Sequence, residues 1–360
     1  MTGSANRLPF EARLARERIL VTGHTGFTGG WLCAWLAGIG VRPHGLALAP
    51  ETQPNLFDSA DIASLAAHTI VDIRDEAAVV RAFAEARPTV VFHLAAQPLV
   101  RRSYSEPAAT FATNVQGTVH VLEAARQTGV KAVVAITTDK VYRNREWIWP
   151  YREVDELGGK DPYSASKACA ELVAASYQAS FGSTGLAVAT ARGGNIVGGG
   201  DWSEDRLIPD FVRATIDGKP LVLRNPNSTR PWQHVLSLCH GYLMLAAGLL
   251  DKPADHIGGW NLGPRTGDVV PVARVIELMA NAWRQPAIRI EPSNLAEARL
   301  LALDSTKARD QLGWHPPWPL ETVIEQTAAW YRDFHAGRST ARALLDKQIA
   351  DYRRALPPQP

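Results

Sequence analysis

Apolar runs alternate with amphipathic segments along the first half of the chain. Segments with helical periodicity lie notably at 75–86, 108–128 and 163–181. Short apolar runs, typical of buried strands, lie between them, at 18–22, 43–48, 68–72, 89–95, 132–138 and 186–192. Strands joined by helical crossovers of this length pair in parallel and are covered by helices on both faces. The pattern therefore predicts an α/β fold with a doubly wound parallel sheet.

The pattern changes after Arg192, where a glycine-rich run is followed by segments rich in proline and arginine. This change predicts a smaller α/β substrate-binding domain at the carboxyl ends of the strands, where doubly wound sheets bind ligands. The helix expected at 235–250 and the short strand at 260–262 should return to the large domain. The expected boundaries are 1–192 with a return segment 233–263 for the sheet domain, 193–232 and 264–330 for the substrate-binding domain, and 331–360 for a C-terminal helix and tail.

Composition narrows the class of protein. With 360 residues, of which 46% are hydrophobic, the chain can bury a sizeable core. A net charge of +2 without a basic stripe argues against nucleic-acid binding, and no run of about 18 apolar residues suggests a membrane span. The three cysteines lack metal-ligand spacing, which indicates reduced thiols in a cytoplasmic protein without a metal site.

A glycine motif follows the first strand. Gly23, Gly26 and Gly29 form Gly-x-x-Gly-x-x-Gly before an apolar helix, so the backbone can approach a pyrophosphate at the helix N-terminus. This arrangement predicts a Rossmann-type dinucleotide site. The second strand ends without the acidic residue that usually binds the adenosine ribose of NAD; Glu51 is the nearest candidate. No arginine stands there to bind a 2′-phosphate, which favours NAD over NADP.

Tyr163 and Lys167 lie four residues apart at the start of a predicted helix, so phenol and ammonium share one face. A cation beside a phenol favours the phenolate, and the pair can then act as a general base toward a sugar hydroxyl. An isolated Tyr-x-x-x-Lys is usually only a surface pair. The glycine motif before it makes the catalytic interpretation stronger.

Taken in order, these motifs resemble the extended short-chain dehydrogenase/reductases (the NAD-dependent epimerase/dehydratase family) over about residues 18–330, and within them the CDP-glucose 4,6-dehydratases. The resemblance rests on Thr22–Phe27, His93–Arg101, Thr138–Lys140, Asn144–Trp147, Gly198–Trp202, Asp205–Asp210 and Arg230–Val235. It implies a lyase that binds NAD and a nucleotide sugar.

The resemblance also implies a set of site residues. Catalysis is expected from Thr138, Asp139, Lys140, Tyr163 and Lys167. Cofactor contacts are expected from Gly23, Thr25, Gly26, Phe27, Thr28, Gly29, Asp72, Ile73, Leu94, Ala95, Ala96, Asn114, Tyr163 and Lys167. Asp72 could instead cap the following helix. Substrate contacts are expected from Gln97, Arg101, Asn195, Arg206, Leu207, Arg224, Arg230 and Arg299, the arginines neutralising a diphosphate.

The implied reaction oxidises the glucose 4-hydroxyl, eliminates water across C5 and C6, and returns the hydride to C6. The elimination falls to Asp139 as acid and Lys140 as base, where many hexose-nucleotide dehydratases carry Asp-Glu. Lys140 could instead stay charged and stabilise the C5 enolate, or the two could form a solvated salt bridge.

Other functions remain open at this point: a sugar-nucleotide 4-epimerase or reductase would need Tyr163 and Lys167 but no acid/base pair, and a non-catalytic NAD-binding regulator would need neither. A homo-oligomer, a dimer or tetramer, is expected.

Overall fold

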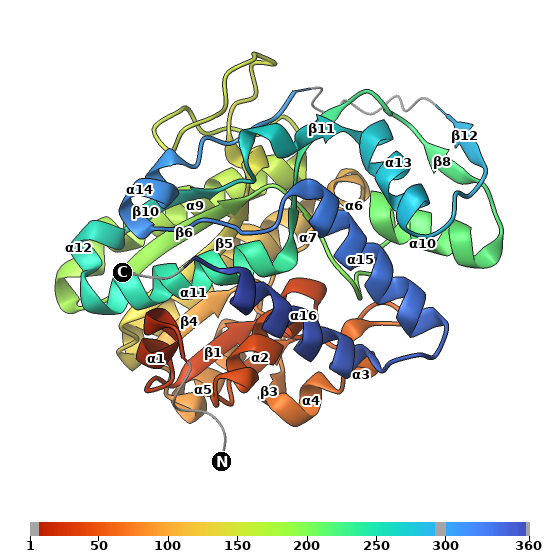
Figure 1. The fold of residues 1–360 in the computed structure, drawn as a ribbon. Helices are drawn as coiled ribbons and strands as arrows, with labels where there is room; N and C mark the ends of the chain where they lie inside the picture. The colour runs from red at the N-terminus through yellow and green to blue at the C-terminus, as the bar shows by residue number, and fades with distance from the viewer. Residues whose placement is uncertain (1–6, 292–299, 358–360) are drawn as a thin grey trace.

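A parallel sheet of seven strands forms the centre of the molecule in the computed structural model, which describes residues 7–291 and 300–357 (Figure 1). The predicted α/β fold is confirmed, because every run predicted as a strand forms one of its members. The strands, in spatial order, are β10 (Gly258–Leu262), β6 (Ala187–Gly193), β5 (Ala132–Thr138), β4 (Val90–His93), β1 (Ile19–Thr22), β2 (His44–Ala47) and β3 (Ala67–Ile70).

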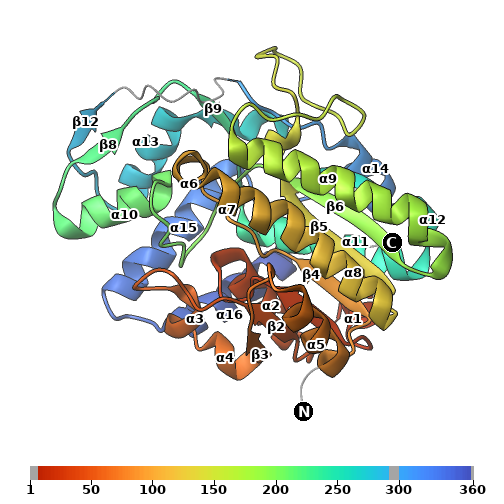
Figure 2. The same ribbon diagram turned by 180° about the vertical axis from the view of Figure 1, so that it is seen from behind.

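Helices cover both faces of this sheet. Figure 1 shows one face with α1 (Pro9–Leu14), α2 (Phe27–Gly38), α11 (Val235–Asp251) and α16 (Ala341–Ala355). Figure 2 shows the opposite face with α5 (Glu76–Ala86), α8 (Gly117–Thr128) and α9 (Pro162–Phe181). Two separate apolar clusters fill these interfaces, and both are built from buried strand residues and the helices above them.

A smaller unit caps the carboxyl ends of the strands. It contains a three-stranded sheet in the order β11 (Val269–Pro271), β9 (Thr229–His234), β7 (Asn195–Val197), and a two-stranded sheet of β12 (Ile288–Ile290) and β8 (Leu221–Leu223). Its helices are α10 (Leu207–Asp217) and α13 (Val272–Ala282). Between β9 and β11 the chain returns to the large sheet through α11 and β10, which pairs in parallel with β6.

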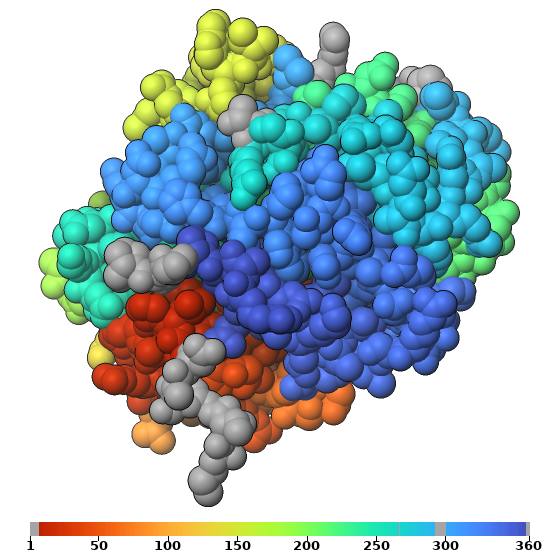
Figure 3. Space-filling model, in the orientation of Figure 1, coloured from red at the N-terminus to blue at the C-terminus, as the bar shows by residue number. Residues whose placement is uncertain are grey.

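The C-terminal helices join the two units. In Figure 3 the blue segments, which include α15 (Leu320–His335) and α16, lie across the front of the molecule between the red N-terminal part and the cyan cap. Trp330 of α15 is fully buried against Gly199, where a Cβ would collide with the indole ring. Packing of this kind fixes the cap relative to the sheet.

None of the described helices combines the length and apolar character needed to cross a bilayer.

Short elements complete the chain. The short elements are α3 (Leu56–Ser59), α4 (Ile62–Leu65), α6 (Val100–Ser105), α7 (Pro107–Phe111), a π-helix η1 (Ala112–Gln116), 3₁₀ turns η2 (Asp139–Val141), η3 (Gly182–Thr184) and η4 (Thr266–Asp268), α12 (Pro253–His256) and α14 (Thr306–Leu312).

Candidate active site

The glycine turn between β1 and α2 forms a cradle of bare backbone. Gly23 has φ +75°, and a Cβ there would lie 2.8 Å from the amide nitrogen of Ala95. A Cβ on Gly29 would collide with the carbonyl oxygen of Gly23. Helix α2 begins directly after Gly26, so its first amides point toward the turn. The local structure fits a pyrophosphate group, as the sequence predicts.

The other residues predicted for the cofactor lie around this turn. The hydroxyl of Thr25 donates to the carbonyl of Leu48 at 2.8 Å. Phe27 and Thr28 are the first two residues of α2, and both are half-buried. Leu94, Ala95 and Ala96 follow β4 and are half-buried. The glycine cradle therefore faces a surface of small and apolar side chains.

Asp72 and Ile73, predicted to meet the adenine, differ in their surroundings. Asp72 pairs with Arg74 at 2.5 Å, and that hydrogen bond lowers the pKa of its carboxyl. The alternative that Asp72 caps the next helix is wrong, because Asp75 accepts the capping hydrogen bond from the amide of Ala78. Ile73 is buried against Gly117 in the core.

Tyr163 and Lys167 come from the first turns of α9. Asp161 caps this helix by accepting from the amide of Ser164 at 2.9 Å, and Pro162 occupies the first position. The ammonium of Lys167 is buried and donates to the carbonyl oxygen of Ile136 in β5 at 2.7 Å. Thr138, at the end of β5, lies beside the phenol of Tyr163. The phenol of Tyr163 therefore lies next to Thr138, and Lys167 binds the same strand two residues before Thr138.

The charge states of Tyr163 and Lys167 differ from the prediction. Burial raises the pKa of Tyr163 to about 12, against the opposing effects of the Thr138 hydroxyl and the Arg206 cation. Burial also lowers the pKa of Lys167 to about 8, against the effect of Glu171. The expected lowering of the phenol pKa by Lys167 is not found, because the ammonium is bonded to the carbonyl of Ile136 in β5 and burial dominates the pKa of the phenol.

Asp139 and Lys140 follow Thr138 in the turn η2. The carboxylate of Asp139 is fully buried and accepts from the Thr138 hydroxyl at 3.0 Å. Lys140 is 29% exposed, and its ammonium lies 3.4 Å from the same carboxylate oxygen. The second oxygen of Asp139 is buried and has no partner among the described residues. A solvated salt bridge does not describe this pair, because the carboxylate is shielded from solvent.

Asn114 forms hydrogen bonds with the backbone of Gln97, in the segment after β4. Its side chain accepts from the amide of Gln97 at 2.8 Å and donates to the carbonyl of Gln97 and the hydroxyl of Ser166. It lies in the π-helix η1, whose extra residue per turn often marks a functional position. Asn114 thereby connects this segment to the helix that carries Tyr163.

The predicted hexose contact by Gln97 is not supported by its surroundings. Its amide nitrogen donates to Leu99 O and the Thr110 hydroxyl, and its amide oxygen accepts from the Leu99 amide. The side chain is buried, and its polar atoms bond to Leu99 in the same segment and to Thr110 in α7. The residue type alone could not reveal this, since the three hydrogen bonds depend on how the segment after β4 packs against α7.

The cap arginines pair with carboxylates. Arg206 lies 3.1 Å from Asp201, and Arg101 and Arg224 both contact Asp205, at 3.1 and 2.7 Å. Burial raises the pKa of Tyr163 and the Arg206 cation opposes that shift, so Arg206 lies on the side of the cap that faces this phenol. The sequence motifs contain both aspartates but did not predict that they pair with these arginines, although both stand within five residues of Arg206.

The remaining substrate predictions are spread over the cap. Asn195 begins β7, Leu207 begins α10, and Arg230 is buried and donates to Thr229 O. Arg299 lies outside the described residues. An open pocket of about 430 Å³ is lined by residues of α10 and β8 together with Asp205 and Arg224. No group of three or more metal-ligating side chains that could hold an ion is found in the parts of the chain that are described.

Comparison with known proteins places this geometry in a family. The chain matches the model of the GDP-mannose 4,6 dehydratase family over residues 20–327. It belongs to that family. It is also 44% identical over 348 residues to a CDP-glucose 4,6-dehydratase of Salmonella typhimurium, covering 94% of this chain and 97% of the relative.

Members of the dehydratase family with other nucleotides are more distant. A dTDP-glucose 4,6-dehydratase of Streptomyces antibioticus is 34% identical over 269 residues, covering 74% of this chain and 76% of the relative. Among solved structures, a Streptomyces venezuelae dTDP-glucose 4,6-dehydratase with NAD bound has a TM-score of 0.77 at 27% identity, covering 89% of this chain and 98% of the other. A Thermus thermophilus UDP-glucose 4-epimerase in complex with NAD also gives 0.77 at 27% identity, with coverages of 88% and 99%.

Proposed function

We propose that this protein is an NAD-dependent CDP-glucose 4,6-dehydratase, a hydro-lyase that forms CDP-4-keto-6-deoxyglucose. The observation that carries the proposal is the 44% identity to the Salmonella CDP-glucose 4,6-dehydratase over nearly the full length of both chains. The site supports it, because Tyr163, Lys167 and Thr138 adjoin the buried Asp139 and Lys140. An epimerase or reductase would not need that last pair.

The glycine cradle and the small side chains after β4 would hold the cofactor. When bound, NAD supplies a hydride acceptor for C4 of the sugar and later a hydride donor for C6. Tyr163 takes the proton from the 4-hydroxyl, and Thr138 orients that hydroxyl. Because burial raises the pKa of Tyr163 to about 12 even with the Arg206 cation nearby, this step needs additional positive charge, which Lys167 and the nicotinamide ring would provide.

The elimination step uses the η2 turn. With C4 oxidised, the C5 proton is acidic and passes to Lys140, while the C6 hydroxyl takes a proton from Asp139 and leaves as water. The unpartnered oxygen of Asp139 is where a carboxylic acid can donate to the leaving group. C5 is reprotonated once hydride has reached C6, so the net change is the loss of one water.

The arginines of the cap would bind the diphosphate. Arg224 and Arg101 share the carboxylate of Asp205, and Arg206 pairs with Asp201. Exchange of these carboxylates for phosphate oxygens retains the charge pairing of each guanidinium. The proposal includes a cytoplasmic homo-oligomer, to be checked by light scattering.

Mass spectrometry of products from a panel of nucleotide hexoses tests this function. We expect CDP-glucose to yield a product lighter by one water, without net formation of NADH. Steady production of NADH with an oxidised hexose that has not lost water would show a simple dehydrogenase, and preference for a dTDP or GDP sugar would reassign the base.

A further inference from the structure

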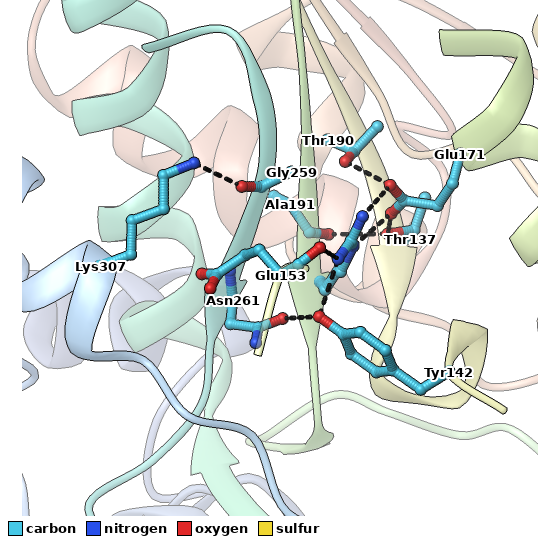
Figure 4. Close-up of polar contacts among 10 residues, drawn as sticks. Thr137, Tyr142, Glu153, Glu171, Thr190, Ala191, Gly259, Asn261 and Lys307 are labelled. Carbon is cyan, nitrogen blue, oxygen red and sulfur yellow. Dashed lines mark hydrogen bonds and ion pairs between the residues drawn. The ribbon is translucent and has the colours of Figure 1, made fainter. Parts of the chain in front are cut away.

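A buried polar network lies directly behind the catalytic residues. Its centre is the carboxylate of Glu171, whose side chain is 3% exposed and paired with Arg192, itself 6% exposed. Glu171 accepts from both Nε and Nη2 of Arg192, at 3.0 and 2.7 Å. It also accepts from the hydroxyls of Thr137 and Thr190, at 2.5 and 2.6 Å (Figure 4).

The network connects the elements that carry the site. Glu171 is eight residues after Tyr163 and four after Lys167, so the three side chains follow one face of α9. Thr137 directly precedes Thr138 and directly follows Ile136, the partner of Lys167. Two neighbouring bonds therefore fasten α9 to the end of β5.

Arg192 extends the network toward the elimination residues. Its Nη1 donates to the hydroxyl of Tyr142 at 2.8 Å, and that hydroxyl donates to the side-chain oxygen of Asn261 in β10 at 2.7 Å. Tyr142 is two residues after Lys140, at the end of the η2 turn. The same ion pair thus contacts the helix of Tyr163 and the turn of Asp139 and Lys140.

Stability alone is a poor reason for this arrangement. Desolvation of two charges usually offsets their attraction, so a buried ion pair adds little net stability compared with apolar residues of the same volume. A fully satisfied pair does impose one geometry on the elements that it joins. We propose that Glu171 and Arg192 are a positioning pair, which sets the distance between Tyr163 and Thr138 and keeps Lys167 charged for the oxidation step.

The proposal that Glu171 keeps Lys167 charged follows from the charges around Lys167. Burial lowers the pKa of its ammonium to about 8, and the negative charge of Glu171 opposes that shift. His93 of β4 faces Lys167 and is kept neutral, since burial and Lys167 lower its pKa to about 3. The remaining charged or titratable groups nearby are Arg192, bonded to Glu171, and Tyr163, Asp139 and Lys140 at the open end of the helix face.

Glu171→Gln tests the proposal in the full-length protein with bound cofactor. Since the variant loses the charge that opposes desolvation, Lys167 should lose its proton at lower pH. We expect kcat to fall about tenfold or more with KM nearly unchanged, and the alkaline limb of the pH profile to move down by about one pH unit. Thr137→Val removes one anchor but keeps the charge, so it should lower kcat at least about threefold without moving the limb.

Glu11→Gln is the matched control. Glu11 is also a fully buried carboxylate bound at two points by an arginine, Arg353, at 2.8 and 2.7 Å, but it joins α1 to α16 far from the site. This variant should lower Tm and leave kcat and the pH profile unchanged. A Glu171→Gln enzyme with wild-type kcat and pH limb, or a Glu11→Gln enzyme with the same shift, would overturn the proposal.

Thr137→Val decides the matter if Glu171→Gln does not fold, because wild-type kcat in the valine variant also contradicts positioning. The positioning role rests on the proposed function, but different results would contradict the positioning role and the function. A wild-type protein that does not dehydrate CDP-glucose contradicts the function. In that case the variants are compared by the reduction of bound cofactor with the panel of nucleotide hexoses, which still tests the positioning role.

Discussion

The ammonium of Lys167 donates a hydrogen bond to the carbonyl oxygen of Ile136 at 2.7 Å, two residues before Thr138 on the same strand. The bond holds the ammonium of Lys167 between α9, which also carries Tyr163, and β5. It therefore fixes the position of the ammonium charge relative to the phenol. In the proposed mechanism, oxidation at C4 depends on how α9 packs against β5.

The first prediction concerns the proposed base of the oxidation step. Tyr163→Phe retains the buried ring but removes the group that accepts the proton of the 4-hydroxyl. Dehydration should fall about 10²–10⁴-fold, the usual contribution of a positioned acid or base, whereas NAD affinity should persist. Product formation by mass spectrometry and cofactor titration measure the two effects, and a loss smaller than tenfold would remove Tyr163 from this role.

Asp139→Asn separates elimination from oxidation. The amide keeps the hydrogen bond with Thr138 but cannot donate a proton as a carboxylic acid to the leaving hydroxyl. We expect bound NADH and a 4-keto hexose to accumulate in a single turnover, with water loss reduced about 10²-fold or more. Rapid quench with absorbance detection checks this; normal water loss would exclude Asp139 as the acid.

The role of Lys140 is decided by pH dependence. If Lys140 is the base, the wild-type elimination rate should rise as its amine loses a proton, and this limb should be absent in Lys140→Met. If it is a fixed cation, the rate should instead fall at high pH. Incorporation of solvent deuterium at C5 follows the same step. A rate that is flat in pH while chemistry is limiting would contradict both roles.

The glycine cradle gives a prediction with an internal control. Gly29→Ala places a Cβ against the carbonyl of Gly23, so NAD affinity should fall about tenfold or more as the turn is displaced. Gly38→Ala, in the same helix, meets no atom within 4 Å and should stabilise the protein by about 0.5–1 kcal/mol. Cofactor titration and thermal unfolding distinguish them. Equal NAD affinity in both variants would rule out the cradle.

Four buried histidines should make the free energy of unfolding fall in acid. Burial lowers the pKa of His24 to about 4, and of His93, His234 and His240 to about 3. These folded-state values lie below the unfolded value of about 6.5, so the unfolded chain takes up more protons as pH falls below 6.5. Their contribution is therefore present above that pH and is lost below it, by at most about 1.4 kcal/mol per pH unit for each histidine.

His240→Leu isolates one member of this set. Both ring nitrogens of His240 are buried without a partner among the described residues, and the ring packs against Phe10, Trp35 and Tyr352. Denaturant unfolding between pH 4 and 7 should show a shallower slope in the variant, by about one proton. An unchanged slope would show that His240 does not contribute to the acid sensitivity.

The sequence alone determined the elements and the chemical groups of this protein. Apolar runs and helical periodicity are local properties, so they placed all seven predicted strands of the central sheet, and the spacings of the glycines and of Tyr163 and Lys167 indicated a candidate site. Only the tertiary structure decided how those groups are charged and paired. It buried the phenol of Tyr163, bonded the amide of Gln97 to Thr110 of α7, and joined Glu171 to Arg192 across 21 positions of the chain. Desolvation and side-chain partners depend on which distant segments pack together, and no local pattern in the sequence records that packing.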